Sequence, residues 1–560
     1  MIKNDRLLPL ENSNLSHWLL GAVATFAMLT VSARDARAQG QPAPPATPPP
    51  AAAPVPATPA PETPPAAPPP ATTPPAAAES AAPAATSAET SAEATSGEAS
   101  TGSGGGLFEQ AQSEADSAES ESGGSSWPFD LNGYVRGDAY VGKVPAGDGR
   151  WETKAAYGEF ALKLRTKKQT YGDAYAETRF RYGLQAEETG AAVDVREAYV
   201  NGYFGPVDVR LGQQVIVWGR ADAFNPTNNL TPFDLRVHSP VDDDRRMGNL
   251  AARVFLNLDP IRIEGVWVPL YRAAEIPSVA VPWYVEFKDT DFPQPDLKNG
   301  TEAVRVHLEL PAFEMSASYL YGYAPLPGLA LSEIALATDT PVHIKRQAYD
   351  HHVVGLDFST AIGDLMGVRG EAAFRFPMHF RSRIYAPNPD LQYALGLDRA
   401  FGSINVIAQY MGRYTFDWKR EQSQPAPEED IRDLTSAQWA PWEDNPPGTV
   451  EDTIARATTQ ANSQLYVTNQ MLFSQLERVQ HLATVRIEWL TLHDTLSLSA
   501  LGFMNFSTQE WLVFPKLGYQ ISDALSTSVG AEIYGGPKRT LFGQIDAQLS
   551  AGYAELRYSF

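Results

Sequence analysis

The last eleven residues of the chain, 550–560 (SAGYAELRYSF), alternate between apolar and polar side chains and end on an aromatic residue. Successive side chains of an extended strand point to opposite faces. One face therefore carries Gly552, Ala554, Leu556, Tyr558 and Phe560, and the other carries Glu555, Arg557 and Ser559. Such a strand can meet hydrocarbon on one side and water on the other. The pattern predicts a strand of a membrane barrel, with a strand of a soluble β-sandwich as the alternative.

The same alternation recurs along the chain from Trp127 onward. Eighteen alternating runs can be counted, from 131–141 to 548–560, with the fifth at 207–218. A barrel whose two ends lie on one side of the membrane needs an even number of strands. No motif repeats at a fixed period, which argues against a β-propeller or a solenoid. The predicted fold is an all-β transmembrane antiparallel β-barrel of about 18 strands, with 16 as the alternative count.

The connections between these runs alternate in length. Short turns include 205–206, 259–260 and 311–312, whereas long connections include 219–247 and 416–463. Transmembrane barrels have short turns at the periplasmic rim and long loops at the outer rim. Residues 127–560 are therefore predicted to form an outer-membrane barrel with both of its ends at the periplasmic rim.

The two faces of each predicted strand differ sharply in polarity. In 156–167, the side chains Phe160, Leu162 and Leu164 oppose Glu159, Lys163 and Arg165. Polarity alone does not show which face points inward, because a soluble sandwich hides its apolar face. A signal peptide and the C-terminal strand indicate a membrane address, so the apolar faces are predicted to contact lipid and the charged faces to line the lumen. Aromatic residues near strand ends, Trp218 among them, are predicted to form interfacial belts.

The first 126 residues lack this pattern. A basic start, the apolar run 18–31 and Ala36-Arg37-Ala38 predict that residues 1–38 are a secretory signal peptide, with a retained anchor helix as the alternative. Residues 39–126 are rich in Pro and Ala and then in Ser and Glu. They have too little apolar surface to offset the entropy of ordering. We expect a disordered tail in the periplasm.

Composition excludes several classes of function. The chain has no cysteine, which removes disulfides, thiolate metal sites and cysteine nucleophiles. A formal net charge of -22 argues against nucleic acid as a partner. Hydrolase, zinc-protease and phosphate-loop motifs are missing, so no catalytic residue, metal or cofactor is predicted. The dense polar cluster Asp350-His351-His352 is expected to be solvated rather than catalytic.

The side chains assigned to the lumen are rich in cations. The predicted pore-lining residues are Lys163, Arg165, Glu177, Arg179, Arg181, Arg196, Arg210, Arg253, Arg262, Glu264, Arg305, Glu309, Arg369, Glu371, Arg486, Glu488, Glu555 and Arg557. Arginines along a pore wall attract anions, which predicts a mild preference for anionic or sugar-like solutes. Alternatively, neighbouring strands pair Arg with Glu and brace the wall with little net field.

The connection after the fifth strand is the candidate constriction of the pore. Gly219 permits a sharp exit from the sheet, and Pro226 and Pro232 stiffen the chain that follows. The candidate constriction residues are Arg220, Asp222, Asp234, Arg236, Asp243 and Arg245. Folded inward, the loop would narrow the pore. Folded outward, its Asp run could bind a divalent cation or lie near lipopolysaccharide.

Two segments carry a resemblance to known proteins. The final strand resembles the C-terminal strand of bacterial outer-membrane barrels, which usually ends in Phe and is read by the barrel-assembly machinery. Residues 211–229 (LGQQVIVWGRADAFNPTNN) resemble the LGRQ, WG and NP strand-to-loop segment of a widespread family of porin-like outer-membrane barrels. The resemblance implies a transport channel. Gln213 stands where Arg is expected, and the Pro-rich tail is not typical of the family.

Together these features predict an integral outer-membrane, porin-like channel for small polar and preferentially anionic solutes, and not an enzyme. The predicted partners are outer-membrane lipid, lipopolysaccharide and the barrel-assembly machinery. The alternative function is an outer-membrane anchor or export partner whose tail contacts peptidoglycan or periplasmic export components.

Overall fold

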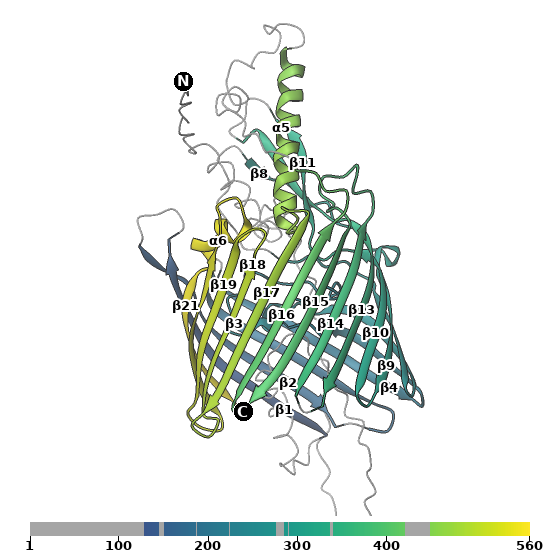
Figure 1. The fold of residues 1–560 in the computed structure, drawn as a ribbon, viewed down its shortest axis with the longest axis vertical. Coiled ribbons are helices and arrows are strands. Elements are labelled where there is room, and N and C mark those ends of the chain that lie inside the picture. Colours follow the sequence, from purple (N-terminus) through teal and green to yellow (C-terminus); the bar gives the residue numbers. More distant parts are fainter. Residues whose placement is uncertain are drawn as a thin grey trace, which may run out of the picture. The chain divides into compact units, whose positions relative to one another are not determined.

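The computed structural model describes residues 128–144, 150–167, 169–185, 188–222, 224–275, 285–288, 290–335, 340–363, 365–420 and 449–560. The predicted signal peptide and tail lie outside these residues. Within the described chain, 18 strands form one antiparallel sheet that closes on itself (Figure 1). Each strand of this sheet pairs with the sheet strands before and after it in the sequence, and the first strand pairs with the last. The predicted antiparallel barrel of about 18 strands is confirmed.

The strands of the barrel are β1 (Phe129–Lys143), β2 (Trp151–Thr166), β3 (Gly172–Gln185), β4 (Glu188–Phe204), β5 (Val207–Gln214), β6 (Asn249–Leu258), β7 (Ile261–Val268), β9 (Thr301–Leu310), β10 (Phe313–Tyr323), β13 (Asp350–Ile362), β14 (Met366–Pro377), β15 (Asp390–Phe401), β16 (Ile404–Thr415), β17 (Val479–Thr491), β18 (Leu496–Asn505), β19 (Glu510–Gln520), β20 (Leu525–Gly535) and β21 (Ala551–Ser559). The other described elements are β8 (Val285–Phe287), β11 (Gly328–Ile334), β12 (Val342–Gln347), the helices α5 (Thr449–Leu472) and α6 (Leu541–Leu549), and the short 3-10 helices η2 (Asp242–Arg245) and η3 (Leu297–Asn299).

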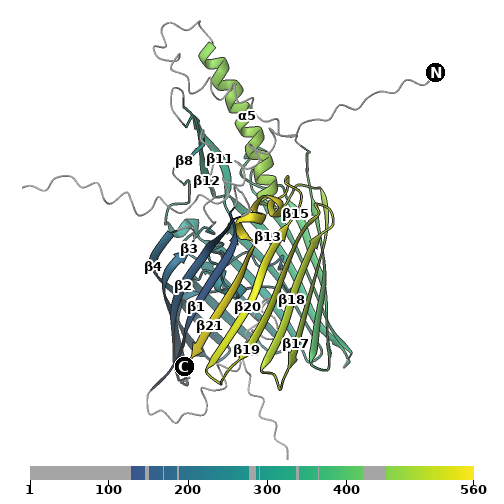
Figure 2. The same cartoon turned by 90° about the vertical axis from the view of Figure 1, so that its left-hand side faces the viewer.

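The barrel closes between its first and last strands, which Figure 2 shows side by side. β1 and β21 pair from Tyr134 opposite Ser559 to Gly142 opposite Ala551. One step further, Gly133 and the terminal residue Phe560 exchange two backbone hydrogen bonds, of 2.9 and 3.0 Å. A bilayer core offers no hydrogen-bond partner to an open strand edge, so closure is what allows this sheet to span it.

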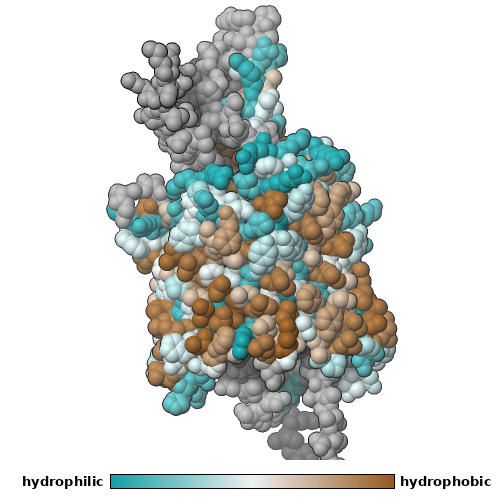
Figure 3. All heavy atoms as spheres, in the orientation of Figure 1, coloured by the Kyte–Doolittle hydropathy of each residue, from teal (hydrophilic) through white to brown (hydrophobic). Residues whose placement is uncertain are grey.

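The outer face of the barrel is apolar. In β13, Val354 and Leu356 are exposed, whereas Val353 and Asp357, which point the other way, are buried. The same alternation in β14 exposes Phe374 and buries Glu371. Figure 3 shows the resulting brown belt on the wall, with hydrophilic residues at the rims. An apolar belt between polar rims is the surface that a bilayer requires, so these side chains face lipid.

Short turns lie at one rim of the barrel and long connections at the other. β4 and β5, β6 and β7, and β9 and β10 are each joined by two residues, whereas 215–248 and 269–300 separate strands at the opposite rim. Gly205, in the first of these turns, has a φ of +68°, which glycine adopts without strain. β1 begins and β21 ends at the short-turn rim (Figure 2).

Among the strand boundaries that differ from the prediction, two change the assignment of named residues or segments. The fifth strand ends at Gln214 rather than at 218, so Trp218 lies in the following loop and is buried instead of standing in an interfacial belt. The last strand begins at Ala551 rather than at 548, because 541–549 form α6. This helix starts where the Thr540 side chain accepts a hydrogen bond from the amide of Gly543, as a helix cap does.

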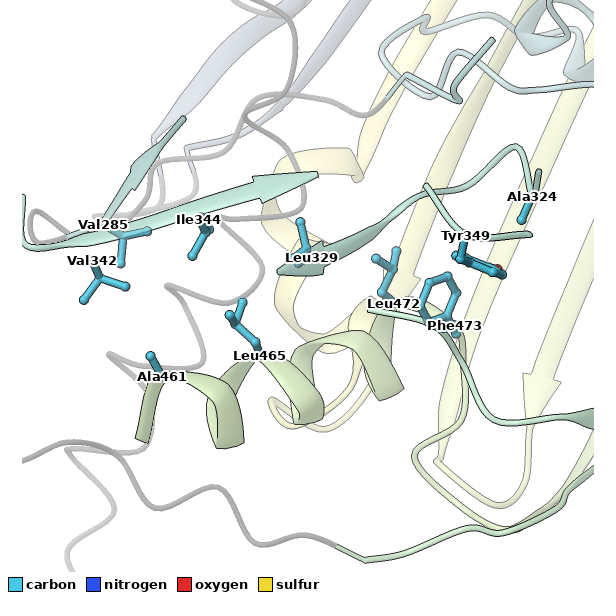
Figure 4. Packing of buried hydrophobic residues seen from close by; sticks show 11 residues of the cluster. Val285, Ala324, Leu329, Val342, Ile344, Tyr349, Ala461, Leu465, Leu472 and Phe473 are labelled. Atoms are coloured by element: carbon cyan, nitrogen blue, oxygen red, sulfur yellow. The ribbon is translucent and has the colours of Figure 1, made fainter. Parts of the chain in front are cut away.

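A small module stands at the long-loop rim and was not predicted from the sequence. β12 pairs antiparallel with β11 and parallel with β8. α5 packs against this sheet, and Figure 4 shows Leu465 of α5 beside Leu329 and Ile344. Ala461, Leu465 and Leu472 recur at helical spacing, so they reach the same hydrophobic cluster from one side of α5. The connection predicted over 416–463 is long, and α5, which begins at Thr449 within it, was not predicted.

Among the described residues, no helix combines the length and the apolar character needed to cross a membrane.

Candidate constriction inside the barrel

The chain turns into the barrel directly after β5. The amides of Val215 and Ile216 donate hydrogen bonds of 2.9 Å to the side chains of Glu197 and Thr231, rather than to a neighbouring strand. The strand ladder therefore ends at Gln214. At Gly219 the φ is +104°, and a Cβ atom there would collide with the side chain of Asn225. We call residues 215–248 the cross-lumen loop.

One part of this loop is anchored to Glu371 on the inner face of β14. The amides of Arg220 and Ala221 each donate to Glu371 Oε2 at 3.0 Å, and the Thr227 hydroxyl donates to Oε1 at 2.7 Å. The amide of Thr227 also donates to Oε1, so a single buried carboxylate satisfies four donors of the loop. The Arg220 guanidinium continues the anchor by donating to Asp357 of β13 at 2.9 Å. We call the wall contacts of residues 220–227 the first anchor.

Asp222 extends the first anchor to two further strands. Its amide donates to Gln409 Oε1 of β16 at 2.9 Å, and its carboxylate accepts a hydrogen bond from Arg486 Nε of β17 at 3.0 Å. The Gln409 amide in turn donates to the carbonyl of Phe224 at 3.3 Å. Hydrogen bonds between ionised groups are the stronger kind, so the pair of Asp222 with Arg486 fixes the loop against this wall.

The other end of the loop is held by a group of arginines on the inner faces of β1 and β3. The Asp244 carboxylate lies 2.7 Å from Arg136 Nη1 and 2.6 Å from Arg179 Nη1, and all three side chains are less than a tenth exposed. Next to it, Arg245 pairs with Glu532 of β20 at 2.7 Å. Asp243 pairs with Arg196 of β4. We call the wall contacts of residues 238–246 the second anchor.

The two anchors lie on different arcs of the barrel. The polar contacts of the first anchor reach β10, β13, β14, β16 and β17, and those of the second reach β1, β3, β4 and β20. In strand order these two sets are separated by β5–β9 on one side and, on the other, by β18 and β19, which contact the loop through apolar side chains. The loop therefore extends through the lumen from one wall to another.

The middle of the loop contacts the rim instead of the barrel wall. Asp234 and Arg236 pair with each other at 2.7 Å, and Leu235 donates its amide to the carbonyl of Glu275 at 2.8 Å. Burial raises the pKa of the Glu275 carboxyl, although the guanidiniums of Arg236 and Arg346 lower it. Of the six candidate constriction residues, Arg220, Asp222, Asp243 and Arg245 thus reach the wall, and Asp234 and Arg236 do not.

Most of the predicted pore-lining arginines have carboxylate partners. The pairs are Arg179 with Glu177, Arg181 with Glu159, Arg196 with Glu177, Arg253 with Glu264, Arg305 with Asp357, Arg369 with Asp398 and Arg486 with Glu488. Asp357 and Asp398 were not among the residues singled out from the sequence. Asp357 lies on the inward phase of β13, two residues after Gly355 and four after Val353, so strand periodicity could have identified it. The ion pairs brace the wall and reduce the net field of the arginines.

Three cations near the short-turn rim are exceptions. In the part of the chain that the structure describes, Lys163, Arg165 and Arg262 form no ion pair. Arg165 instead lies over the ring of Tyr175 at 5.3 Å, and Arg262 lies over the ring of Phe255 at 4.4 Å. A cation over an aromatic face keeps its full charge.

The remaining predicted lumen residues lie on β5, β9 and β21. Arg210 donates to Asn201 at 2.7 Å, Arg557 lies over the ring of Tyr134 at 4.2 Å, Glu555 lies 3.7 Å from Arg136, and Glu309 is exposed near the end of β9.

The wall beneath the first anchor is apolar. Met411, Phe503 and Leu512 point inward from β16, β18 and β19 and form a buried cluster with Ala221 of the loop. The ring of Phe503 lies 5.0 Å from that of Phe224 in the loop and 5.7 Å from that of Phe542 in α6. Burial of these side chains adds a hydrophobic contribution to the ionic anchors and seats both the loop and α6 on this arc.

Comparison with known proteins gives a partial family match. A model described as "Protein of unknown function (DUF1302)" matches residues 76–243, less than a third of the chain. The match includes most of the cross-lumen loop and the segment 211–229. No curated protein matches the sequence.

Several solved porins are similar in their overall barrel. OccAB3 of Acinetobacter baumannii has 10% identity and a TM-score of 0.43, over 77% of this chain and 99% of that chain. OpdK of Pseudomonas aeruginosa, solved with vanillate, has 8% identity and a TM-score of 0.43, over 77% and 98% of the two chains. A BenF-like porin from Pseudomonas fluorescens Pf-5 has 9% identity and a TM-score of 0.44, over 77% and 98%. Similarities this low do not bear on the solute.

The closed 18-stranded sheet, its apolar outer face and its two unequal rims make this chain a transmembrane β-barrel of the outer-membrane type.

Proposed function

We propose that the protein is an outer-membrane channel for small polar solutes and that the cross-lumen loop sets the width of its pore. The observation that carries this proposal is the pair of anchors that hold one loop to two arcs of the inner wall. A barrel that served only as a membrane anchor would not need a loop fixed inside its lumen. Charged side chains along the wall keep the lumen wet, which favours polar solutes.

Anions are the proposed preferred solutes, and the preference is expected to be mild. Lys163, Arg165 and Arg262 support it, because their positive charge near the short-turn rim is not balanced by a bonded carboxylate. The ion pairs of the other arginines limit it. A solute entering from the periplasmic side, or leaving toward it, would pass these three cations.

Planar bilayer recordings test the proposal. The purified chain should form discrete conductance steps, and a salt gradient should give a reversal potential of the sign set by anion permeation. Liposome swelling with sugars, organic acids and amino acids would then rank the solutes. Absence of conductance from correctly folded barrels would contradict the channel function, and a clear cation preference would contradict the anion preference.

The position of the tail is part of the same proposal. Residues 1–38 are proposed to be removed as a signal peptide, and residues 39–126 to lie in the periplasm as an unfolded tail. This is supported by β1, which begins at the short-turn rim. Deleting residues 40–126 separates two roles. Unchanged conductance and assembly would favour a channel with a spacer, whereas lost export or assembly would favour a tail that contacts periplasmic machinery or peptidoglycan.

A further inference from the structure

We infer that the outer rim above β14–β17 binds the phosphorylated headgroup of an outer-leaflet glycolipid, such as lipid A. This inference concerns the outside of the barrel and rests on the proposed function only for the placement of the long-loop rim at the cell surface. Its evidence is a group of exposed aromatic rings on the lipid-facing wall with a group of exposed guanidiniums directly beside them.

The aromatic part of the site lies at the upper end of the lipid-facing belt. Phe374 and Phe376 of β14 are 37% and 40% exposed, and Phe416 is 39% exposed. The rings of Phe374 and Phe416 are 5.7 Å apart, and that of Tyr414 lies 4.9 Å from Phe416. The ring of Phe380 lies 5.9 Å from that of Phe376. Aromatic residues of this kind are typical of the boundary between acyl chains and headgroups.

The cationic part of the site lies directly beside these rings. Arg478, at the start of β17, lies over the ring of Tyr414 with its guanidinium carbon 5.2 Å from the centroid. Arg381 pairs at 2.7 Å with Asp417, the residue after Phe416. The side chains of Arg381 and Asp417 are 78% and 48% exposed, so water reaches this pair and a stronger anion could compete for the arginine.

A third guanidinium completes the group. Arg420 pairs at 3.0 Å with Glu477, the neighbour of Arg478, and its side chain is 64% exposed. It also lies over the indole ring of Trp418 at 5.7 Å. Arginines that stack on aromatic rings keep donors free for phosphate, which they can bind through two parallel hydrogen bonds.

The balance of charge in these segments is opposite to that of the whole chain. Beside the rings, residues 378–389, 416–420 and 473–479 contain five Lys and Arg residues and two Asp and Glu residues, whereas residues 421–472 of the same connection contain two Lys and Arg residues and nine Asp and Glu residues. Figure 3 shows hydrophilic residues at this rim, immediately above the brown belt. The site therefore offers positive charge at headgroup depth and rings at acyl depth, which complements a phosphorylated glycolipid and not a neutral lipid.

Native mass spectrometry of the purified full chain in detergent tests the site. The probes are bisphosphorylated lipid A, enzymatically dephosphorylated lipid A and phosphatidylethanolamine. We expect lipid A to bind at least about tenfold more tightly than the dephosphorylated form, because the dephosphorylated lipid cannot accept charged hydrogen bonds through phosphate. The triple variant R381Q/R420Q/R478Q should lose about tenfold in affinity for lipid A.

Arg399→Gln is the matched control. Arg399 lies over the ring of Phe401 at 4.7 Å, near the end of β15 at the opposite rim of the barrel. It is thus another exposed arginine on an aromatic ring, but it faces the inner leaflet, where lipid A is absent. This variant should bind lipid A like the original chain.

Three outcomes would overturn the inference: equal binding of lipid A and its dephosphorylated form, unchanged binding by the triple variant, or displacement of lipid A by millimolar inorganic phosphate. If the triple variant does not fold, the comparison of lipids on the original chain decides.

Bilayer conductance of the same preparations separates this site from the channel. Loss of glycolipid binding with normal conductance would support both proposals, and phosphate-selective binding by a barrel without conductance would support the site alone.

Discussion

Asp222 and Arg486 are 264 positions apart in the chain, yet Arg486 Nε lies 3.0 Å from the Asp222 carboxylate inside the barrel. The Asp222 side chain is 4% exposed and that of Arg486 is 15% exposed. One residue belongs to the cross-lumen loop and the other to β17, so this ion pair joins the loop to the wall. Removing it should release the loop without altering the sheet.

The variant Asp222→Asn tests this consequence. We expect the loop to loosen because Arg486 loses its charged partner, at a cost of about 1–3 kcal/mol. Single-channel conductance should rise or fluctuate more, while heat-modified mobility on gels, which reports the barrel, should stay unchanged. Asp234→Asn is the matched control, because Asp234 pairs only with Arg236 within the same loop among the contacts described above. Identical conductance of both variants would contradict the role of the anchor.

Asp244→Asn should have a larger effect than Asp222→Asn. It removes two buried ion pairs instead of one, and each hydrogen bond to a charged group contributes about 1.5–3 kcal/mol, although Arg136 keeps Glu159 and Arg179 keeps Glu177. Limited proteolysis should cut the loop between 228 and 246 faster in this variant. Asp242→Asn is the control, because its partner Arg245 keeps Glu532. Equal protection of the loop in both variants would show that Asp244 does not hold it.

The barrel could be predicted from the sequence because its signal is local. Lipid outside and water inside impose an alternation on every strand, so each strand can be recognised without knowing its partners. The C-terminal strand shows this well, since Leu556 and Tyr558 are exposed and Glu555 between Ala554 and Leu556 is buried. The strand boundary at Gln214 was missed because it depends on the side chains of Glu197 and Thr231, which lie in other segments.

The candidate site could be predicted only in part for the same reason. Inward-facing arginines follow from strand phase, but their partners depend on register and on loop contacts such as that of Asp222 with Arg486. The helix α5 was missed for another reason. The side it buries includes Gln464, Thr468 and Asn469, so its sequence lacks a continuous apolar stripe.

The module at the long-loop rim should depend on Asn469. Its Oδ1 accepts the amide of Leu329 at 2.9 Å, and its Nδ2 donates to the carbonyls of Leu329 and Ile384 at 2.8 and 3.0 Å. Asn469→Leu leaves these buried backbone groups without partners, at about 1–3 kcal/mol for each unsatisfied group. Amide hydrogen exchange should quicken in β11 and α5 and remain slow in β13–β17. Gln460→Leu, at a half-buried position of α5, is the matched control and should leave exchange unchanged.

The anion preference should depend on cations near the short-turn rim. Lys163→Gln with Arg165→Gln removes two charges that no bonded carboxylate balances, and the ratio of chloride to potassium permeability should fall roughly twofold. Reversal potentials in a salt gradient measure the ratio. Arg399→Gln, on the outer face, removes charge without changing the lumen and should have no effect. A permeability ratio unaffected by the double variant would remove the basis for anion selection at this rim.

The small sheet at the rim should weaken in acid because of Glu333. Its Oε1 lies 2.8 Å from His343 Nδ1 and 3.1 Å from Lys288 Nζ, and Glu286 lies 3.3 Å from the other ring nitrogen of His343. The hydrogen bond with His343, followed by that with Lys288, lowers the pKa of Glu333 below its usual range. A lowered pKa in the folded state stabilises the sheet above the unfolded pKa, and this contribution is lost as the pH falls through the folded pKa. Amide hydrogen exchange of β11 and β12 should therefore quicken, after correction for intrinsic rates, as the pH falls below about 4.5, the ordinary pKa of a glutamate. Glu333→Gln should exchange faster than the original chain at neutral pH and lose most of the acid effect, whereas an unchanged pH profile in this variant would assign the acid sensitivity to another group.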